Sequence, residues 1–217
     1  DVVIVGGGPT GVEMAGSIAD IAYKNLIKDF RNFSSKEAKI YLIEASDQIL
    51  PMFDEKLSNK ARQYLCDFGV IVRTNERVVN ITKNVVETQN DTLDADTIIW
   101  AAGNEASPLL KSLNTVMDKQ GRVIVNSDCS IKSYPNIFVI GDAAHFKSND
   151  HPLPGIAPVA IQQGRFVAKV IRKNKKERPE FIYFDKGIMA TIGKSKAIAE
   201  TGPLKLTGLI AWLTWSL

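Results

Sequence analysis

The chain has 217 residues and a mass of 23.9 kDa; 45% of its residues are hydrophobic and 24% are charged. This composition excludes a collagenous, a disordered and a disulfide-stapled protein, and the length allows one large domain or two smaller ones. Lys and Arg number 27 against 24 Asp and Glu, so the formal charge of +3 gives no reason to expect a nucleic-acid partner.

The two cysteines, Cys66 and Cys129, lie far apart and show neither a CxxC nor a metal-binding spacing. This pattern favours a reducing compartment and predicts no metal site. His145 and His151 also lack partners at ligand spacing, so we interpret both as structural.

Both ends of the chain are unusual. Asp1 leads directly into an apolar run, without a Met or a signal-peptide n-region, and the chain stops at Leu217 inside another apolar run. We therefore expect the chain to be a fragment of a longer protein.

The first hundred residues alternate between short apolar runs and stretches with helical spacing. The predicted elements are a strand at 2–5, a helix at 11–31, a strand at 40–43, a helix at 54–68 and a strand at 70–72. Residues 77–100 then alternate around polar turns, as in an antiparallel excursion, and residues 98–102 are apolar again. This order predicts a doubly wound α/β domain over residues 1–103.

The pattern changes after Gly103. Strands are predicted at 121–125 and 137–140, and a helix at 159–172 with Pro158 at its first position. We expect a second region over residues 104–172 and a third over 173–217. The basic stretch at 165–178 is typical of a solvated helix end, although it would also suit anionic headgroups.

The glycine motif Gly6-x-Gly8-x-x-Gly11, which includes Pro9 and Thr10, lies between a predicted strand and a predicted helix. Its glycines would allow a tight turn, close approach of a pyrophosphate to the backbone, and close packing of strand and helix. A Walker loop would need Gly-Lys-Ser/Thr here, whereas Val12 and Glu13 follow Gly11. The motif therefore predicts dinucleotide binding.

Two acidic residues accompany this motif. Glu44 ends the second strand, where a carboxylate would bind the adenosine ribose hydroxyls and repel a 2′-phosphate, so NAD(H) is favoured over NADP(H). A solvated or capping acid is the alternative. Glu13 is expected in the first turn of the helix, either interacting with the helix dipole or lying near the nicotinamide.

Gly141 and Asp142 follow a predicted strand, so Asp142 would lie at a carboxyl edge and either accept ligand hydroxyls or cap the next turn. In the next helix, small residues recur along one face, which suits helix packing better than the approach of a flat ring. These small residues are Ala157, Ala160 and Gly164. Gln162 and Gln163 could donate to a carbonyl ligand or lie on the surface.

The segment 204–217 is the most hydrophobic part of the chain, but it is shorter than the roughly 18 residues of a membrane-spanning helix. Trp212 and Trp215 are helical neighbours, as in an interfacial aromatic belt. We favour a membrane-surface helix over a buried core helix.

Together these motifs resemble a known superfamily. The glycine motif, WAAG at 100–103 and FVIGDAA at 138–144 occur in this order in the two-dinucleotide-binding flavoproteins, which are related to the FAD-dependent pyridine nucleotide-disulfide oxidoreductases. The stretches VVIVGGGPTGVEMAG, IYLIEASDQILPMF and LPGIAPVAIQQG are similar to the type II, non-proton-pumping NADH:quinone oxidoreductases. The resemblance implies a Rossmann-like α/β NADH domain with an antiparallel excursion, followed by the C-terminal part of a split FAD domain.

The resemblance also implies roles for individual residues. Those that would contact NADH are Gly6, Gly8, Pro9, Thr10, Gly11 and Glu44, with Glu13 near the nicotinamide and Ala102 and Gly103 at a cofactor-facing strand end. Those that would contact the FAD ribitol are Gly141, Asp142 and Ala143. Ala157, Ala160, Gln162 and Gln163 would line the quinone pocket beside the flavin ring, with Gln162 and Gln163 on the quinone side. Many members have Ala-Gln where this chain has Ala157-Pro158, which removes one amide from the implied quinone pocket.

The implied activity is hydride transfer from NADH to FAD, followed by reduction of a quinone in a respiratory chain. The protein would attach peripherally to the cytoplasmic face of the plasma membrane, or to the mitochondrial inner membrane in a eukaryote, and a homodimer remains open. The family's N-terminal FAD-binding half is absent from this sequence, so the chain alone is expected to bind NADH weakly and not to retain FAD. The alternatives are a soluble disulfide or ferredoxin-type reductase and a non-catalytic NAD-binding module.

Overall fold

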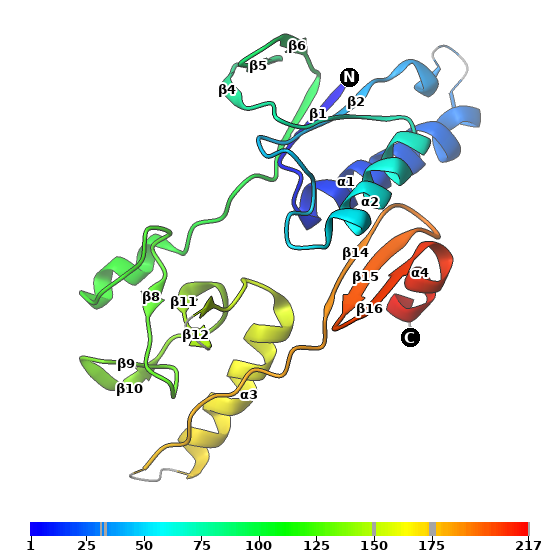
Figure 1. Cartoon of the computed structure of the whole chain (residues 1–217). Coiled ribbons are helices and arrows are strands. Elements are labelled where there is room, and N and C mark those ends of the chain that lie inside the picture. Colours follow the sequence, from blue (N-terminus) through cyan, green and yellow to red (C-terminus); the bar gives the residue numbers. More distant parts are fainter. Residues whose placement is uncertain (31, 33, 149–150, 174–176, 217) are drawn as a thin grey trace. The chain divides into compact units, whose positions relative to one another are not determined.

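Four short apolar strands form a parallel sheet in the order β3-β2-β1-β7 (Figure 1). They are β1 (Val2–Val5), β2 (Ile40–Ile43), β3 (Val70–Arg73) and β7 (Thr97–Trp100). Val2 pairs with both Ile40 and Thr97, so the carboxyl ends of the three strands meet at one edge of the sheet. This arrangement is the predicted doubly wound sheet, and the edge is where ligands bind in such folds.

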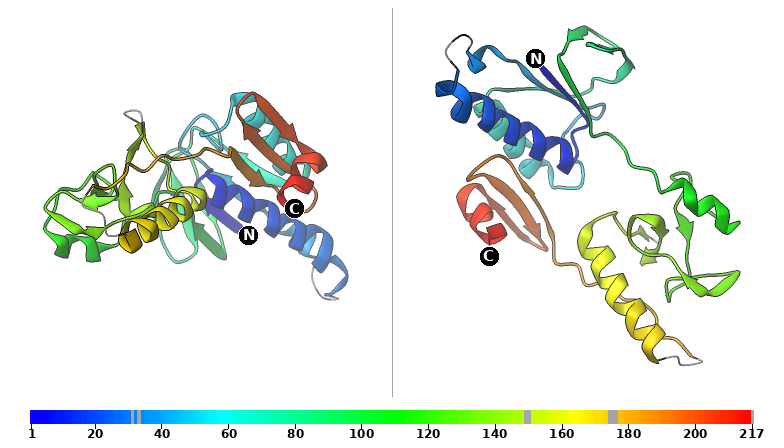
Figure 2. Two further views of the ribbon diagram at one scale, coloured as in Figure 1. Left: turned by 90° about the horizontal axis from the view of Figure 1, so that it is seen from below. Right: turned by 180° about the vertical axis from the view of Figure 1, so that it is seen from behind.

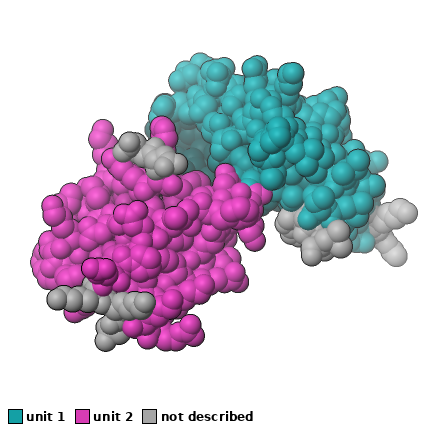
Figure 3. Space-filling model, turned by 60° about the horizontal axis from the view of Figure 1, so that its bottom comes forward, with its two compact units in different colours: residues 1–103, 187–217 teal, residues 104–186 magenta. Residues whose placement is uncertain are grey.

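The structure is a computed structural model that describes residues 1–30, 32, 34–148, 151–173 and 177–216. Residues 1–103 and 187–217 form one compact unit, and residues 104–186 form a second (Figures 2 and 3). The units thus divide the chain differently from the predicted regions 104–172 and 173–217, because the last thirty-one residues pack with the first unit.

The parallel sheet is covered on both faces, which explains why its strands are apolar throughout. Helices α1 (Pro9–Asp20) and α2 (Glu55–Asp67) pack on one face, around Ile4 and Leu42. The antiparallel strands β4 (Val78–Ile81), β5 (Val85–Thr88) and β6 (Thr92–Asp94) cover the other face, around Val3 and Ile43. The predicted antiparallel excursion is therefore present.

Helix α1 differs from the helix predicted over 11–31. It begins at Pro9, two residues earlier, and its α-helical part ends at Asp20. A π-helical turn and short 3-10 helices continue the chain at Ile21–Asn25, Leu26–Lys28 and Ser35–Glu37. Arg31, the expected end of the helix, lies outside the described residues.

Helix α2 agrees closely with its prediction because its ends carry local signals. The Asp54 side chain caps the helix by accepting from the Lys56 N–H at 3.0 Å. Gly69 follows the helix with φ of +88°, a conformation that favours glycine.

The end of the chain forms an antiparallel sheet and a short helix that belong to the first unit. The elements are β14 (Ile188–Thr191), β15 (Ala197–Thr201), β16 (Leu204–Thr207) and α4 (Gly208–Ser216). The interpretation of 204–217 as one helical segment was therefore wrong over its first four residues. Gly208, at φ of +71°, separates the strand from the helix.

The second unit consists of short strands around one long helix. Its elements are η4 (Pro108–Leu113), β8 (Val123–Ile124), β9 (Ser130–Ile131), β10 (Tyr134–Phe138), η5 (Gly141–Ala143), β11 (Ala144–His145), β12 (Lys147–Ser148), β13 (His151–Pro152) and α3 (Ala157–Lys173). The strand predicted at 137–140 was wrong in its bounds, because β10 begins earlier, ends at Phe138 and pairs with β9. Pro158 is the second residue of α3 and not the first.

In the described part of the chain, no helix is both long and apolar enough to cross a membrane.

Candidate functional site

The glycine turn between β1 and α1 is built by backbone atoms that leave no room for side chains. Gly6 has φ of +110°, and a Cβ there would lie 2.7 Å from the Ala102 backbone nitrogen. A Cβ on Gly11 would overlap the Gly6 carbonyl oxygen. These two glycines therefore allow β1, the end of β7 and α1 to approach closely.

Gly8 has a different environment from Gly6 and Gly11. It caps the start of α1, and an added Cβ would meet no atom within 4 Å. Pro9 and Thr10 follow as the first helical residues, and Thr10 is exposed. The open space at the N-terminal end of α1, where backbone N–H groups and the helix dipole favour negative charge, is suited to a phosphate.

The Glu44 carboxylate is held against this turn by hydrogen bonds. It accepts from the Gly7 N–H at 2.6 Å and from the Ser46 N–H at 2.8 Å. Partial burial raises the pKa of Glu44, but the backbone donors of Ser46 and Gly7 outweigh it, and the pKa lies below its usual value. The group is therefore an ionised acceptor beside the predicted phosphate site.

A hollow opens beside Glu44 and Gly6, and it includes two residues that the sequence analysis missed. Trp100, with 60% of its surface exposed, ends β7 and donates from Nε1 to the Ala102 carbonyl at 2.6 Å. Arg77 precedes β4 and also lines the hollow. Arg77 is 33 residues from Glu44 in the sequence, so no local pattern connects it with this hollow.

The other residues predicted to contact NADH, which are Ala102, Gly103 and Glu13, do not lie together. Ala102 lines the same hollow, and Gly103 follows it with φ of +70°. Glu13 lies in the second turn of α1, and not in the first as predicted, because the helix begins at Pro9. Its Oε1 accepts from both the N–H and the hydroxyl of Thr191, each at 3.2 Å, so the carboxylate connects α1 to β14.

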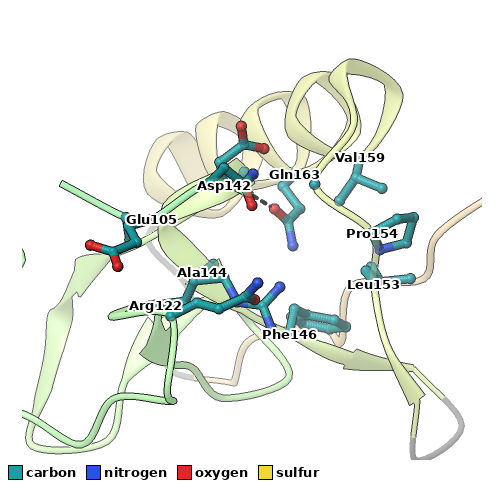
Figure 4. A pocket seen from close by; sticks show the side chains of 14 residues that line it. Glu105, Arg122, Asp142, Ala144, Phe146, Leu153, Pro154, Val159 and Gln163 are labelled. Carbon is teal, nitrogen blue, oxygen red and sulfur yellow. Dashed lines mark hydrogen bonds between the residues drawn. The ribbon is translucent and has the colours of Figure 1, made fainter. Parts of the chain in front are cut away.

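A pocket in the second unit contains the Gly141–Asp142 segment (Figure 4). Gly141 has φ of +62°, which turns the chain after the β10 region, and Asp142 is exposed in the following 3-10 turn with Ala143. A Cβ on Gly155 would lie 3.2 Å from Asp142 Oδ1, so this loop passes close to the carboxylate. The charged and amide side chains around the pocket are those of Asn104, Glu105, Gln120, Arg122, Asp142 and Gln163.

The two neighbouring glutamines of α3 have separate environments. Gln163 is 1% exposed, and its Oε1 accepts from the Gly141 N–H at 2.7 Å (Figure 4). Gln162 instead exchanges two hydrogen bonds with the Phe184 backbone, donating at 2.9 Å and accepting at 3.0 Å. The structure therefore does not bring the two amides to one place.

The small residues of α3 pack against their own unit. A Cβ on Gly141 would lie 3.0 Å from the Ala160 Cβ, and one on Gly164 would lie 3.6 Å from Ile140. Ala157 is the exposed first residue of the helix. Ala160 and Gly164 thus contact the Gly141 turn and Ile140, which is not the packing against another helix that the spacing favoured.

A cluster of Asp118, Arg122 and His145 adjoins the pocket and was not predicted. Asp118 Oδ2 accepts from Arg122 Nε at 2.7 Å and lies 2.9 Å from His145 Nδ1. Burial raises the pKa of Asp118, but hydrogen bonds from His145 and Arg122 outweigh it and hold the pKa well below its usual value. His145 thus has a structural contact, and His151 lies exposed in β13.

Within the described residues, His, Cys, Asp and Glu side chains nowhere gather in a group of three or more that could hold a metal ion. Cys66 is an exposed free cysteine and Cys129 a buried one.

Comparison with known proteins identifies similar sequences and folds. A family model described as pyridine nucleotide-disulphide oxidoreductase matches residues 1–164. The type II NADH:quinone oxidoreductases Ndh and NdhA of Mycobacterium tuberculosis are 38% and 37% identical, each over 98% of this chain and 48% of the relative. The solved structure of Plasmodium falciparum NDH2 in complex with NADH has a TM-score of 0.87 and 20% identity, covering 99% of this chain and 61% of that one.

These matches confirm the predicted Rossmann-like α/β fold. The chain spans about half the length of the curated relatives that it matches.

Proposed function

The chain belongs to the pyridine nucleotide-disulphide oxidoreductase family, and from this membership we propose that the whole protein is a type II NADH:quinone oxidoreductase. The observation that carries the proposal is the 38% identity to a type II NADH:quinone oxidoreductase over 98% of the chain. The glycine turn and the anchored Glu44 add local support.

The first unit would bind NADH. The phosphates would lie against the N-terminal end of α1, where Gly8 leaves open space and Pro9 and Thr10 begin the helix. Glu44 would accept from the ribose hydroxyls, and its negative charge favours NADH over NADPH. The adenosine would lie in the hollow lined by Ala102 and Arg77, and Gly103 directly follows Ala102 in the chain.

We place Glu13 on the nicotinamide side of α1. Its Oε1 is held by Thr191, so its role there would be to fix α1 against β14 and not to transfer a proton. Hydride transfer needs no general base, and we assign none.

The second unit would hold part of an FAD. Gly141 and Ala143 turn the chain so that the exposed Asp142 carboxylate is free to accept from ribitol hydroxyls, which fits a polyol. Bound FAD would supply the redox chemistry, taking a hydride from NADH and delivering electrons to a quinone.

The start of α3 would lie on the quinone side of the flavin. Ala157 and Gln162 are the residues that we place there, with Ala160 closer to the cofactor. The Gln162 amide is oriented by its two hydrogen bonds to the Phe184 backbone. To donate to a quinone carbonyl, its N–H₂ group would have to break its hydrogen bond to the Phe184 carbonyl or use its second N–H. Gln163 faces Gly141 and belongs on the cofactor side.

The protein would attach peripherally to a membrane, where its quinone is dissolved. Helix α4 exposes large apolar side chains, with Leu209, Ile210 and Leu213 exposed to 54%, 66% and 48%. We propose the cytoplasmic face of the plasma membrane, or the inner mitochondrial membrane in a eukaryote, as its location. A homodimer is compatible with this attachment.

The proposal is tested by the substrate preference of the full-length protein. NADH oxidation should accelerate when a short-chain quinone is added and should not respond to a disulfide such as oxidised glutathione. The reverse preference would identify a soluble disulfide reductase of the same family and refute the proposal. A Glu44→Gln variant should weaken NADH binding and reduce discrimination against NADPH, whereas Glu87→Gln, on the antiparallel sheet, should leave both unchanged.

A further inference from the structure

We propose that Leu50 and Ser58 are positioning residues for NADH, because the turn at residues 49–53 directs the Gly8 N–H toward the pyrophosphate of the cofactor. This inference rests on the proposed NADH binding of the first unit. Both side chains are buried, so they would act through backbone peptide groups and not by touching the cofactor.

The start of α1 offers a phosphate fewer N–H groups than a helix without proline in its first turn. Pro9 has no N–H, and the Val12 N–H already donates to the Gly8 carbonyl at 3.0 Å. The N–H groups that precede the first intrahelical hydrogen bond are those of Gly8, Thr10 and Gly11. The direction of the Gly8 N–H is therefore important for binding an anion here.

Hydrogen bonds hold both sides of Gly7, the residue before this donor. The Leu50 N–H donates to the Gly7 carbonyl at 2.7 Å, and the Gly7 N–H donates to Glu44 Oε2 at 2.6 Å. A trans peptide group is planar, and its C=O and N–H point in opposite directions. Because the Gly7 carbonyl points to Leu50, the Gly8 N–H points away from Leu50. Leu50 thus fixes the direction of a donor that it does not contact.

Leu50 has a backbone conformation that is unfavourable for leucine. Its φ is +51°, and its side chain is fully buried in the core of the first unit. Such a conformation persists only where the surrounding structure enforces it, and it is concentrated at ligand sites. The strained residue is also the one whose N–H reaches the Gly7 carbonyl. We infer that the strain serves to place this N–H.

Helix α2 anchors the strained turn. The buried Ser58 Oγ donates to the Ile49 carbonyl at 2.6 Å, and this carbonyl belongs to the same peptide group as the Leu50 N–H. The Ile49 side chain also packs on the glycine turn, since a Cβ on Gly7 would lie 2.9 Å from Ile49 Cγ2.

The Ser58 hydroxyl, the Ile49–Leu50 peptide group and the Gly7–Gly8 peptide group therefore form a chain of hydrogen bonds with one direction. Each donor in such a chain polarises the next one and strengthens it. The chain ends at the Gly8 N–H, which becomes a fixed and strengthened donor for a negatively charged oxygen.

The first test measures NADH binding to the full-length protein by the fluorescence of NADH. Ser58→Ala removes the first donor of the chain and should raise the Kd of NADH about fivefold or more. Ser35→Ala is the matched control, because Ser35 is also buried and its Oγ donates to the Ala22 carbonyl at 2.6 Å, in another part of the first unit. It should leave the Kd within about twofold of the wild-type value.

Two substitutions of Leu50 separate positioning from packing. Leu50→Ala and Leu50→Gly both leave a cavity in the core, so both should lower the melting temperature. Glycine adopts a φ of +51° without strain, whereas alanine should leave this conformation once leucine packing no longer enforces it. The Kd of NADH should therefore rise about fivefold or more in Leu50→Ala and stay within about twofold of wild type in Leu50→Gly.

The effect should also depend on the pyrophosphate. In Ser58→Ala, ADP-ribose, which contains a pyrophosphate, should displace NADH less well by the same factor, and displacement by adenosine should not change. An unchanged Kd of NADH in Ser58→Ala, an equal loss of affinity in the two Leu50 variants, or an equal loss for ADP-ribose and adenosine would overturn the positioning role.

The same measurements distinguish this role from the proposed function. If the variants change NADH binding as expected but the wild-type protein reduces no quinone, the proposed function is refuted and the positioning role stands. A wild-type protein that binds no NADH refutes both.

Discussion

Gly8 and Gly11 belong to one motif but perform different tasks. A Cβ at position 11 would overlap the Gly6 carbonyl, whereas a Cβ at position 8 would meet nothing within 4 Å. Gly8 has φ of −71°, which any residue adopts. The fold thus requires glycine at position 11. At position 8 a side chain would instead fill the open space at the N-terminal end of α1, where we place the phosphates of NADH.

Substituting each glycine with alanine should separate these two roles. Gly11→Ala should lower the melting temperature clearly, since overpacking of this kind costs about 1–3 kcal/mol or more. Gly8→Ala should leave the melting temperature nearly unchanged but weaken NADH binding, measured by NADH fluorescence. Equal effects of the two substitutions on stability would contradict this assignment.

Asp118 should make stability depend on pH. Because its pKa in the folded protein lies below its usual value, its contribution is present above the unfolded-state pKa of about 4 and is lost as the pH falls further. Thermal unfolding between pH 7 and 3 should therefore show a steeper loss for wild type than for Asp118→Asn. Parallel curves would show that the carboxylate is not held by His145 and Arg122 in solution.

The contact between α1 and the turn after β14 joins two segments that are far apart in the sequence. Gly16 allows this contact, since a Cβ there would lie 2.6 Å from the Gly193 nitrogen. One turn later, the buried Asp20 accepts from the Lys194 N–H at 2.5 Å and pairs with Lys24. An acid at the end of an apolar helix is thus used to hold a turn that is distant in sequence.

Gly16→Ala should weaken this contact. Because the atom that the new methyl group meets is backbone, we expect destabilisation of about 1–3 kcal/mol, measured by chemical denaturation. Ser17→Ala, at an exposed position of the same helix, is the control and should change stability by less than about 0.5 kcal/mol. Equal effects would mean that the turn moves freely away from α1.

The sequence predicts elements well where local signals mark them. Asp54 and Gly69 bracket α2, and the apolar strands of the parallel sheet stand out because both of their faces are buried. The two-residue strands of the second unit have no such pattern, since they depend on contacts between distant segments. Helix α4 was joined to β16 in the prediction because apolar residues continue across Gly208.

The candidate site follows the same physical rule. The glycine motif, Glu44 and the Gly141–Asp142 turn are local signals, so the sequence predicts these candidate positions, and their ligand contacts stay predictions. Arg77 and Arg122 reach their pockets from separate segments, and neither has a distinguishing sequence neighbourhood. Glu13 was placed one turn too early because the start of α1 at Pro9 was not recognised.

At the scale of the whole molecule, the exposed apolar face of α4 should govern membrane attachment. Replacing Leu209, Ile210 and Leu213 together with serine should reduce binding of the full-length protein to phospholipid vesicles, measured by co-sedimentation, because apolar burial drives interfacial binding. Leu109→Ser, at a residue 75% exposed in the second unit, is the control and should bind as wild type does. Undiminished binding of the triple variant would assign the attachment to another surface.

The first unit is assembled from two segments, residues 1–103 and 187–217, with the second unit between them. During synthesis on the ribosome, α1 emerges long before the strand and turn that Gly16 and Asp20 contact. While more than eighty further residues are translated, the face of α1 that contacts this turn therefore stays uncovered in the nascent chain, and so does the Asp20 carboxylate. Chaperone engagement and the pace of translation through the second unit should thus influence the yield of folded protein more than the intrinsic folding rate of the parallel sheet.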